Sequence, residues 1–498
     1  MFTLNSKSTE RSESVSNPSS SNEINNILLV GNGFDLAVGL KTSYSDFVKF
    51  LAIKIYLSNV IKDLKRNQSY QEWIISCLYD KKICDSQYAN IFVKAIKELN
   101  KSNEPSLFDE EKLNNILDNQ FMKDFLYLVL SSDVMKILTR EDTISISALS
   151  ESYKNVKNSF SSLIDFEKYV SQHPFSSNEE AEEQFSAKHD FYSFLTELNK
   201  SISFSNIKQW VDVESFIEFL VTNNRDLSVR FYPERNYEKT YDSLLFDNPS
   251  LYKEYFKGLE DFCNLFKEYL CTVLNSDFVW FPSGTHSGNI KAFEHFKGGF
   301  ESPYSESLLN RSHGFIEFSK ILHIKELINY NYTYTAEAYL YFRHLYGIYN
   351  HTYHVNGELD YDFHYQLQNV KSMSNHLVFG FSNTNSIKLK STLHTFEKKV
   401  LRVIKNTTPL NLDKLTSKPF NLLIYGHSCG VADGDVIGKL LKSSKLQIAV
   451  VLCYDQESLV SITNNLIEIV EPARFDELIS NANQKVGNES LYFAVKDE

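Results

Sequence analysis

A short apolar run near the start of the chain leads into residues suited to binding a ligand. The run is Ile27–Val30, and its length and composition are typical of a strand buried on both faces of a parallel sheet. The glycine and polar residues that follow it are Gly31, Asn32, Gly33, Asp35 and Gly39. Glycines permit a tight turn and a close approach of backbone to a ligand, and the N–H groups that begin a helix attract an anion. The segment predicts a nucleotide-binding first turn, with a purely structural strand–helix turn as the alternative.

Asp35 and Leu36 distinguish this turn from the dinucleotide motif G-x-G-x-x-G. Leu36 stands at the position of the third glycine. Asp35 would lie in the first turn of the helix, where a carboxylate interacts favourably with the helix dipole. The same carboxylate would occupy the positive helix end that a pyrophosphate needs. We therefore expect Asp35 to face a ribose hydroxyl, or the phosphates to lie to one side, and we do not expect a dehydrogenase-type diphosphate cradle.

A second group of polar residues follows the predicted strand Glu326–Tyr330. The segment Asn329–Thr333 reads N-Y-N-Y-T and lies at the carboxyl end of that strand, where ligands of open α/β sheets bind. If the chain is still extended here, Asn329 and Asn331 point to the same side. An amide offers both a donor and an acceptor, which suits a sugar hydroxyl or a water molecule. Asn331 is therefore a candidate catalytic residue, and a loop turn is the alternative.

His354 and Asn356 come at the end of another predicted strand, Tyr353–Val355, just before Gly357. On an extended strand, residues two positions apart lie on the same face, so His354 and Asn356 would share one. His354 is a candidate general base, and a buried histidine with a backbone partner is the alternative. Asn356 is a candidate catalytic residue beside it.

The loop after the predicted strand Phe420–Tyr425 reads G-H-S-C-G, which fits the nucleophile elbow of α/β-hydrolases. No histidine follows His427, so the chain order Ser–acid–His of that triad cannot be completed, and a serine esterase is a minor alternative. We expect instead a second loop of the nucleotide site, formed by Gly426, Ser428 and Asp433. Asp433 can accept a hydrogen bond from a ligand, or it can cap the helix that follows.

Strand-like runs and helical patterns alternate after residue 320, which indicates parallel β-α-β units. The expected strands are Ile27–Val30, Glu326–Tyr330, Tyr353–Val355, Leu377–Phe381, Phe420–Tyr425 and Leu446–Cys453. The expected helices between them are Ser386–Lys405, Val436–Leu441 and Leu459–Ile469. Amphipathic runs dominate the preceding region, among them Ile91–Leu99, Asp124–Leu138, Phe191–Leu198, Tyr252–Leu274 and a helix that starts at Trp210. We predict an α/β protein with a Rossmann-like parallel sheet split by a large, mainly helical insertion.

This organisation divides the chain into four parts. Residues 1–22 are Ser-rich and are expected to form a disordered tail. Residues 23–51 would form the first part of the Rossmann-like domain, residues 52–320 the helical insertion, and residues 321–498 the second part of the domain.

Composition excludes several classes of function. The 498 residues carry 63 Asp and Glu against 51 Lys and Arg, and this net charge of −12 argues against general nucleic-acid binding. The cysteines are scattered without a C-x-x-C pair, which indicates free thiols and no metal site: Cys77, Cys84, Cys263, Cys271, Cys429 and Cys453. No apolar run reaches the roughly 18 residues of a membrane span, and the N-terminus lacks the apolar h-region of a secretory signal. We expect a cytoplasmic protein with no membrane partner; a homo-oligomer stays open.

Several of these motifs together resemble the AbiH family of bacteriophage abortive-infection proteins. The resemblance rests on the segments Val30–Phe47, Trp210–Glu214, Asn329–Thr333, Val378–Gly380 and Gly426–Asp433. Two positions depart from the family pattern: Lys41 stands where proline is usual, and Asn356 stands where the family usually has the histidine of a His-Gly pair. The resemblance implies a bacterial anti-phage protein that responds to an unknown phage trigger.

AbiH proteins are in turn similar to the sirtuin superfamily. Gly31, Gly33 and Gly39 keep the glycine spacing with which sirtuins open. Asn331 matches the catalytic asparagine of sirtuins, and Asn356-Gly357 falls on their His-Gly pair. This resemblance implies NAD or a related nucleotide as ligand, but not deacetylation, because the four-cysteine zinc module of sirtuins has no counterpart here.

The expected function is therefore an anti-phage effector that binds a dinucleotide, NAD being the first candidate, and cleaves its N-glycosidic bond on infection. The expected catalytic residues are Asn331, His354 and Asn356. The expected nucleotide-binding residues are Gly31, Asn32, Gly33, Asp35, Gly39, Gly426, Ser428 and Asp433. A non-enzymatic nucleotide sensor is the main alternative.

Overall fold

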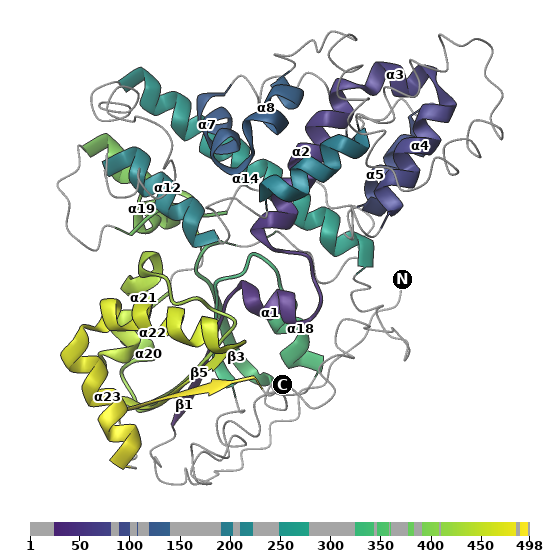
Figure 1. Ribbon diagram of the computed structural model, residues 1–498. Helices are drawn as coiled ribbons and strands as arrows, with labels where there is room; N and C mark the ends of the chain where they lie inside the picture. Colours follow the sequence, from purple (N-terminus) through teal and green to yellow (C-terminus); the bar gives the residue numbers. More distant parts are fainter. Residues whose placement is uncertain are drawn as a thin grey trace, which may run out of the picture.

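The computed structural model describes residues 24–80, 89–99, 107, 119–139, 191–202, 210–222, 249–277, 324–342, 346–357, 359, 377–382, 391–407, 410–484 and 489–496. A half that contains the sheet lies below a larger group of helices (Figure 1). The predicted tail, residues 1–22, lies outside the described residues, as does Cys84.

One sheet organises the lower half. Its six strands are β1 (Asn25–Val30), β2 (Ile324–Asn329), β3 (Tyr346–His354), β4 (Phe420–Tyr425), β5 (Leu446–Cys453) and β6 (Ser490–Val495). They lie in the order β3-β2-β1-β4-β5-β6, and every neighbouring pair is parallel. This is the Rossmann strand order, whose topological switch point lies between β1 and β4. The predicted α/β class and Rossmann-like sheet are confirmed.

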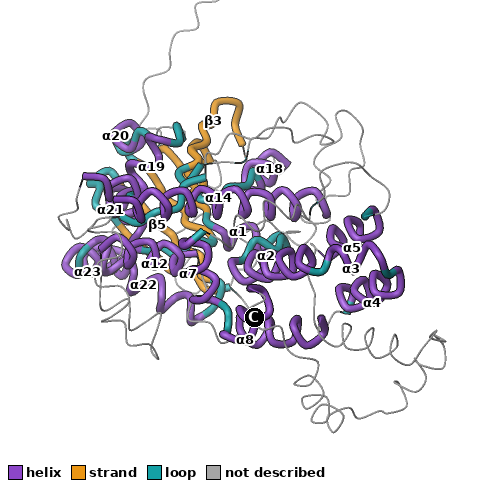
Figure 2. Tube along the Cα trace, turned by 90° about the horizontal axis from the view of Figure 1, so that it is seen from above, coloured by secondary structure: helices purple, strands orange, loops and turns teal. Residues whose placement is uncertain are grey.

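Register and side-chain alternation fix what each face of the sheet packs against. Ile27 and Leu29 face one side, where they form a core with Leu440 of α21 (Gly434–Leu441) and Leu466 of α22 (Gln456–Val470). Leu28 and Val30, one residue out of step, face the other side and join a second core. The two cores follow from the period of two in a strand. Figure 2 shows helices on both sides of the strands.

Seven α-helices and two short 3-10 helices belong to the described parts of the chain that carry the sheet. They are α1 (Asn32–Ala37), α18 (Thr335–Phe342), α19 (Lys398–Ile404), α20 (Leu412–Leu415), α21 (Gly434–Leu441), α22 (Gln456–Val470) and α23 (Pro472–Gln484), with the 3-10 helices η3 (Ser391–Phe396) and η4 (Val431–Asp433). Phe34 of α1 packs edge-on against Tyr339 of α18 and Tyr425 at the end of β4.

The upper half is helical, as predicted. Its labelled helices are α2 (Tyr44–Asn59), α3 (Ile61–Arg66), α4 (Gln68–Tyr79), α5 (Ala89–Glu98), α7 (Gln120–Val129), α8 (Ser132–Thr139), α12 (Trp210–Thr222) and α14 (Pro249–Asp277), and residues 191–202 are helical too. Phe47 of α2 packs against Phe262 and Phe266 of α14. These rings belong to the same core as Leu28 and Val30 of β1, so the helical part and the sheet share one hydrophobic core. The predicted boundary at residue 52 falls inside α2.

Three expected elements differ. Leu377–Phe381 is not a strand of the sheet: its only ladder contact is an isolated bridge from Phe381 to Glu397, because this apolar run is buried against the helical core instead. The predicted helix Ser386–Lys405 is η3 and α19, with residues 383–390 outside the described part. The run Asp124–Leu138 is broken between α7 and α8. The sequence patterns also missed β6 and α23.

Candidate functional site

A cavity of about 360 Å³ lies at the carboxyl edge of the sheet, over the switch point between β1 and β4. Nine of the predicted site residues line it: Gly31, Asn32, Gly33, Asp35, Asn331, Asn356, Gly426, Ser428 and Asp433. Its size falls within the range of small-ligand sites. The structure therefore brings together segments that are separated by about 400 residues in the chain. Gly39 and His354 are not among the lining residues.

The glycines of the first turn are required by a contact between two loops. A Cβ atom on Gly33 would lie 2.7 Å from Cα of Gly426, and one on Gly31 would lie 2.7 Å from Cα of His427. The N–H of Gly33 donates to the carbonyl of Gly426 at 2.8 Å. This amide is therefore not presented to a phosphate, and α1 is only six residues long. Gly39, at φ +88°, serves the turn after α1.

Asp35 is a buried carboxyl that lines the cavity. Its carboxylate accepts from the Thr333 hydroxyl at 2.7 Å, and Nδ2 of Asn331 donates to it at 3.3 Å. Burial raises the pKa of Asp35 to about 7, although the hydroxyl hydrogen bonds favour the charged form. The group thus changes protonation state near neutral pH.

The Asn329–Thr333 loop presents Asn331 to this carboxyl. β2 ends at Asn329, whose Oδ1 accepts from the Asn331 N–H at 2.8 Å while its Nδ2 donates to the Thr333 carbonyl at 3.0 Å. The two asparagines therefore do not share an extended strand face: Asn329 is buried and builds the loop, and Asn331 lines the cavity.

His354 lies beneath that loop rather than in the cavity wall. It is the last residue of β3 and is 2% exposed. Its Nε2 lies 2.9 Å from Oε1 of Glu337, and its Nδ1 lies 3.4 Å from the carbonyl of Asn331. The chain turns after β3, so His354 and Asn356 do not share a face as the extended-strand pattern predicted. His354 supports the Asn331 loop, and Asn356 alone reaches the cavity.

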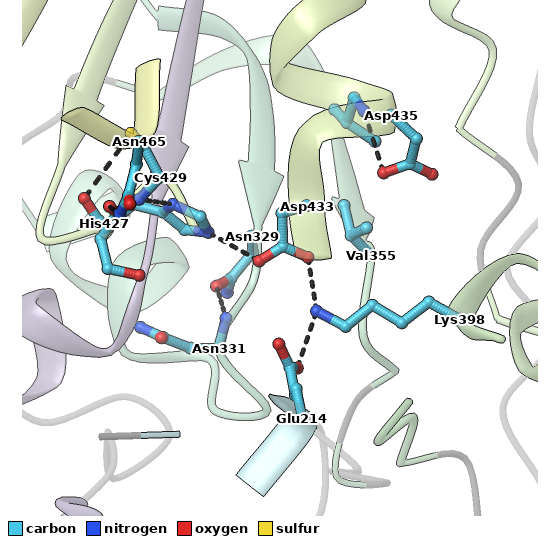
Figure 3. Close-up of polar contacts among 12 residues, drawn as sticks. Glu214, Asn329, Asn331, Val355, Lys398, His427, Cys429, Asp433, Asp435 and Asn465 are labelled. Carbon is cyan, nitrogen blue, oxygen red and sulfur yellow. Dashed lines mark hydrogen bonds and ion pairs between the residues drawn. The ribbon is translucent and has the colours of Figure 1, made fainter. Parts of the chain in front are cut away.

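On the opposite side, Asp433 belongs to a buried charge cluster (Figure 3). Lys398 Nζ contacts Oδ1 of Asp433 at 2.6 Å and Oε1 of Glu214 at 2.7 Å. Burial alone would raise the pKa of Asp433, but Lys398 and His427 outweigh it and hold the pKa well below its ordinary value. Burial raises the pKa of Glu214 to about 7. Asp433 occupies the N-cap position of α21 without a capping hydrogen bond, so the cluster, not the helix end, occupies its side chain.

His427 lies next to the second carboxylate oxygen of Asp433, Oδ2. Its Nδ1 accepts from the Cys429 N–H at 2.9 Å, which leaves the proton on Nε2. That nitrogen lies 3.5 Å from Oδ2 of Asp433. The imidazole is thus engaged at both nitrogens, and within the described residues no hydrogen bond joins it to the Ser428 hydroxyl. The hydrolase elbow has no assembled base here.

Several lining or supporting residues had not been predicted from the sequence as site residues, among them Glu214, Tyr330, Thr333, Lys398 and His427. Glu214 comes from α12 in the helical part, and the sequence indicated it only as part of the segment Trp210–Glu214 that carries the family resemblance. Lys398 sits in a run of charged residues that resembles a solvated helix face, and only the fold shows that it is buried. Among the described residues, no group of His, Cys, Asp and Glu is arranged to hold a metal ion. None of the described helices has the length and apolarity to cross a membrane.

Residues 27–160 match the model of the family described as Bacteriophage abortive infection AbiH. The predicted resemblance is confirmed over these residues, which include the Gly31–Gly39 turn. Searches of curated proteins and of solved structures find no match to the chain.

Proposed function

We propose that this member of the AbiH family is a phage-defence enzyme that binds NAD, or a closely related dinucleotide, in the switch-point cavity and hydrolyses the bond between ribose and nicotinamide. The observation that carries the proposal is Asp35, a buried carboxyl in the cavity wall that Thr333 and Asn331 hold in place. Its pKa of about 7 suits a general base at neutral pH.

The second carboxyl of the cavity, Asp433, supports the same chemistry. Lys398 and His427 keep it ionised, whereas Asp35 exchanges a proton near neutrality. Carboxyls whose pKa values are driven apart are typical of sites that hydrolyse glycosidic bonds, where one handles the proton and the other stabilises positive charge on the sugar.

In the proposed reaction, the C1′–N bond breaks and its electron pair goes to the nicotinamide nitrogen, which loses its positive charge. The ionised Asp433 stabilises the ribosyl cation that remains. Asn331 orients a water molecule, whose oxygen bonds to C1′ while its proton passes to Asp35. Nicotinamide leaves as a neutral molecule, so the leaving group needs no general acid.

A nucleotide sensor without turnover is the second candidate. Glu214 favours it, because this side chain of α12 lines the cavity and is joined through Lys398 to Asp433. A ligand that displaces the Asp433 carboxylate from Lys398 would therefore also change the contact of Lys398 with Glu214 of α12, a helix of the insertion.

The test is release of nicotinamide from NAD by the purified chain, together with NAD levels in infected cells that produce wild type, Asn331→Ala or the control Asn465→Ala. Asn465 lies on α22 and contacts only the Ser428 carbonyl in the described part of the chain, at 3.0 Å. We expect NAD to fall in wild type and control, but not in Asn331→Ala. Binding of NAD without loss in any strain would favour the sensor. An absence of both binding and loss would contradict both candidates.

A further inference from the structure

Three buried polar side-chain groups near the carboxyl end of the sheet have no hydrogen-bond partner among the described residues. They are Oδ1 of Asn356, the hydroxyl of Tyr330 and one terminal nitrogen of Arg402. Asn356 is 6% exposed and Tyr330 is 5% exposed, and both line the cavity. A buried polar group left unpaired is costly, so native structures pair nearly all of them with protein, water or ligand.

Arg402 relates the three groups in space. Its Nε donates to the Val355 carbonyl at 3.0 Å, next to Asn356, and its unpaired nitrogen lies 3.9 Å from Oδ1 of Asp433. The Tyr330 ring lies 4.3 Å from the His427 ring, which faces the other oxygen of Asp433. Figure 3 shows Val355, Asp433 and His427 in this part of the site. Asn356 and Tyr330 therefore present a lone acceptor and a hydroxyl to the cavity, whereas Arg402 lies outside its lining residues.

This combination discriminates among ligand groups. Asn356 Oδ1 needs a donor, and the Tyr330 hydroxyl can donate or accept. A phosphate offers acceptors only, would leave Asn356 unpaired and would be repelled by Asp433. A primary carboxamide offers one carbonyl oxygen and one NH₂ group in a fixed plane.

We propose that Asn356 and Tyr330 form a subsite for a primary carboxamide, with Asn356 accepting from its NH₂ group and the Tyr330 hydroxyl donating to its oxygen. The inference deepens the proposed function, on which it rests, because it places the nicotinamide end of the dinucleotide beside Asp433. Asn356 is then a specificity-determining residue.

The experiment uses small probes, so that it can fail separately from NAD turnover. Nicotinamide and 3-acetylpyridine are neutral and similar in size, but the second carries a methyl group in place of NH₂. Their binding to the full-length chain is measured by ligand-observed NMR for wild type, Asn356→Ala and Asn421→Ala. Asn421 is the matched control: it is buried, its Oδ1 is also unpaired, and it lies in β4 at the amino end, where its Nδ2 donates to Asn26 at 2.9 Å.

We expect wild type and Asn421→Ala to bind nicotinamide about tenfold more tightly than 3-acetylpyridine, since one buried acceptor would be left unpaired. In Asn356→Ala the two probes should bind within about twofold of each other. Tyr330→Phe, which keeps the ring, should weaken both probes if Asn356→Ala proves unfolded. Equal binding of the two probes to wild type would overturn the subsite. The subsite would also be overturned if the binding of ribose, but not of nicotinamide, depended on Asn356. That result would assign these groups to a sugar diol. If the protein hydrolyses NAD but binds the two probes equally, the proposed function stands and the carboxamide subsite is refuted.

Discussion

Asp35 and Asp433 line the same cavity, yet their surroundings drive their pKa values in opposite directions. Asp35 receives hydrogen bonds from the neutral groups of Thr333, Thr335 and Asn331, and burial raises its pKa to about 7. Asp433 is equally buried, but Lys398 touches it at 2.6 Å and its pKa lies well below the ordinary value. One buried cation thus decides which carboxyl can exchange a proton at neutral pH and which stays charged.

The two carboxyls are also held in place by different parts of the chain. Asp35 lies in α1, and its partners Asn331 and Thr333 follow β2, so these groups all come from the sheet half. The cluster around Asp433 joins Lys398 of α19 to Glu214 of α12. The cations that keep Asp433 ionised, Lys398 and His427, come from the chain after the insertion, and the insertion contributes Glu214 to the same cluster.

Replacing Asp35 by Asn should have the largest effect, on turnover. Loss of a general base costs about 10²- to 10⁴-fold in rate. Wild-type turnover should fall as pH decreases through about 7, because the base is protonated there. The measurement is a pH–rate profile of NAD hydrolysis, with the exposed Asp413→Asn as control. An unchanged profile in Asp35→Asn would remove Asp35 from the reaction.

Replacing Lys398 by Met should have the next largest effect, on stability. The change leaves Glu214 and Asp433 buried without their cation, and breaking a buried ion pair in this way costs about 3–5 kcal/mol in the free energy of unfolding. Lys405 provides a matched control on the same side of the fold. It pairs with Glu260 of α14 at 3.0 Å, but that carboxylate is 43% exposed, so Lys405→Met should cost at most about 1 kcal/mol.

Urea denaturation of the two lysine variants tests this contrast. Equal losses in the free energy of unfolding would mean that the buried cluster around Asp433 contributes no more to stability than the Lys405–Glu260 pair. A Lys398→Met protein that stays folded should also titrate Asp433 at higher pH, because the attraction that lowers the pKa of this carboxyl is gone. Spectroscopic titration of Asp433 would detect that shift.

The sequence allowed five of the six strands and nine of the residues that line the cavity to be predicted, because strand ends in a parallel sheet meet at one edge. Ile27–Val30 and Phe420–Tyr425 read as buried strands, and the polar residues after them do line one cavity. Lys398 and Glu214 could not be predicted, since their burial depends on how α12 and α19 pack. The run Leu377–Phe381 was misassigned because an apolar segment buried under helices has the same composition as a buried strand.

The smallest effect should come from His354→Ala, and it should appear in stability rather than in the chemistry. His354 is buried, lies 2.9 Å from Glu337 and supports the carbonyl of Asn331 without reaching the cavity. Removing it leaves Glu337 without this contact and opens space under the loop, for a loss of about 1–3 kcal/mol. Because Asp35 keeps its own partners, the pH at which turnover falls should not move. Melting temperature and the pH–rate profile are measured together. A stable His354→Ala protein whose profile loses its acidic limb would make His354 the base, and Asp35 would then be the supporting group.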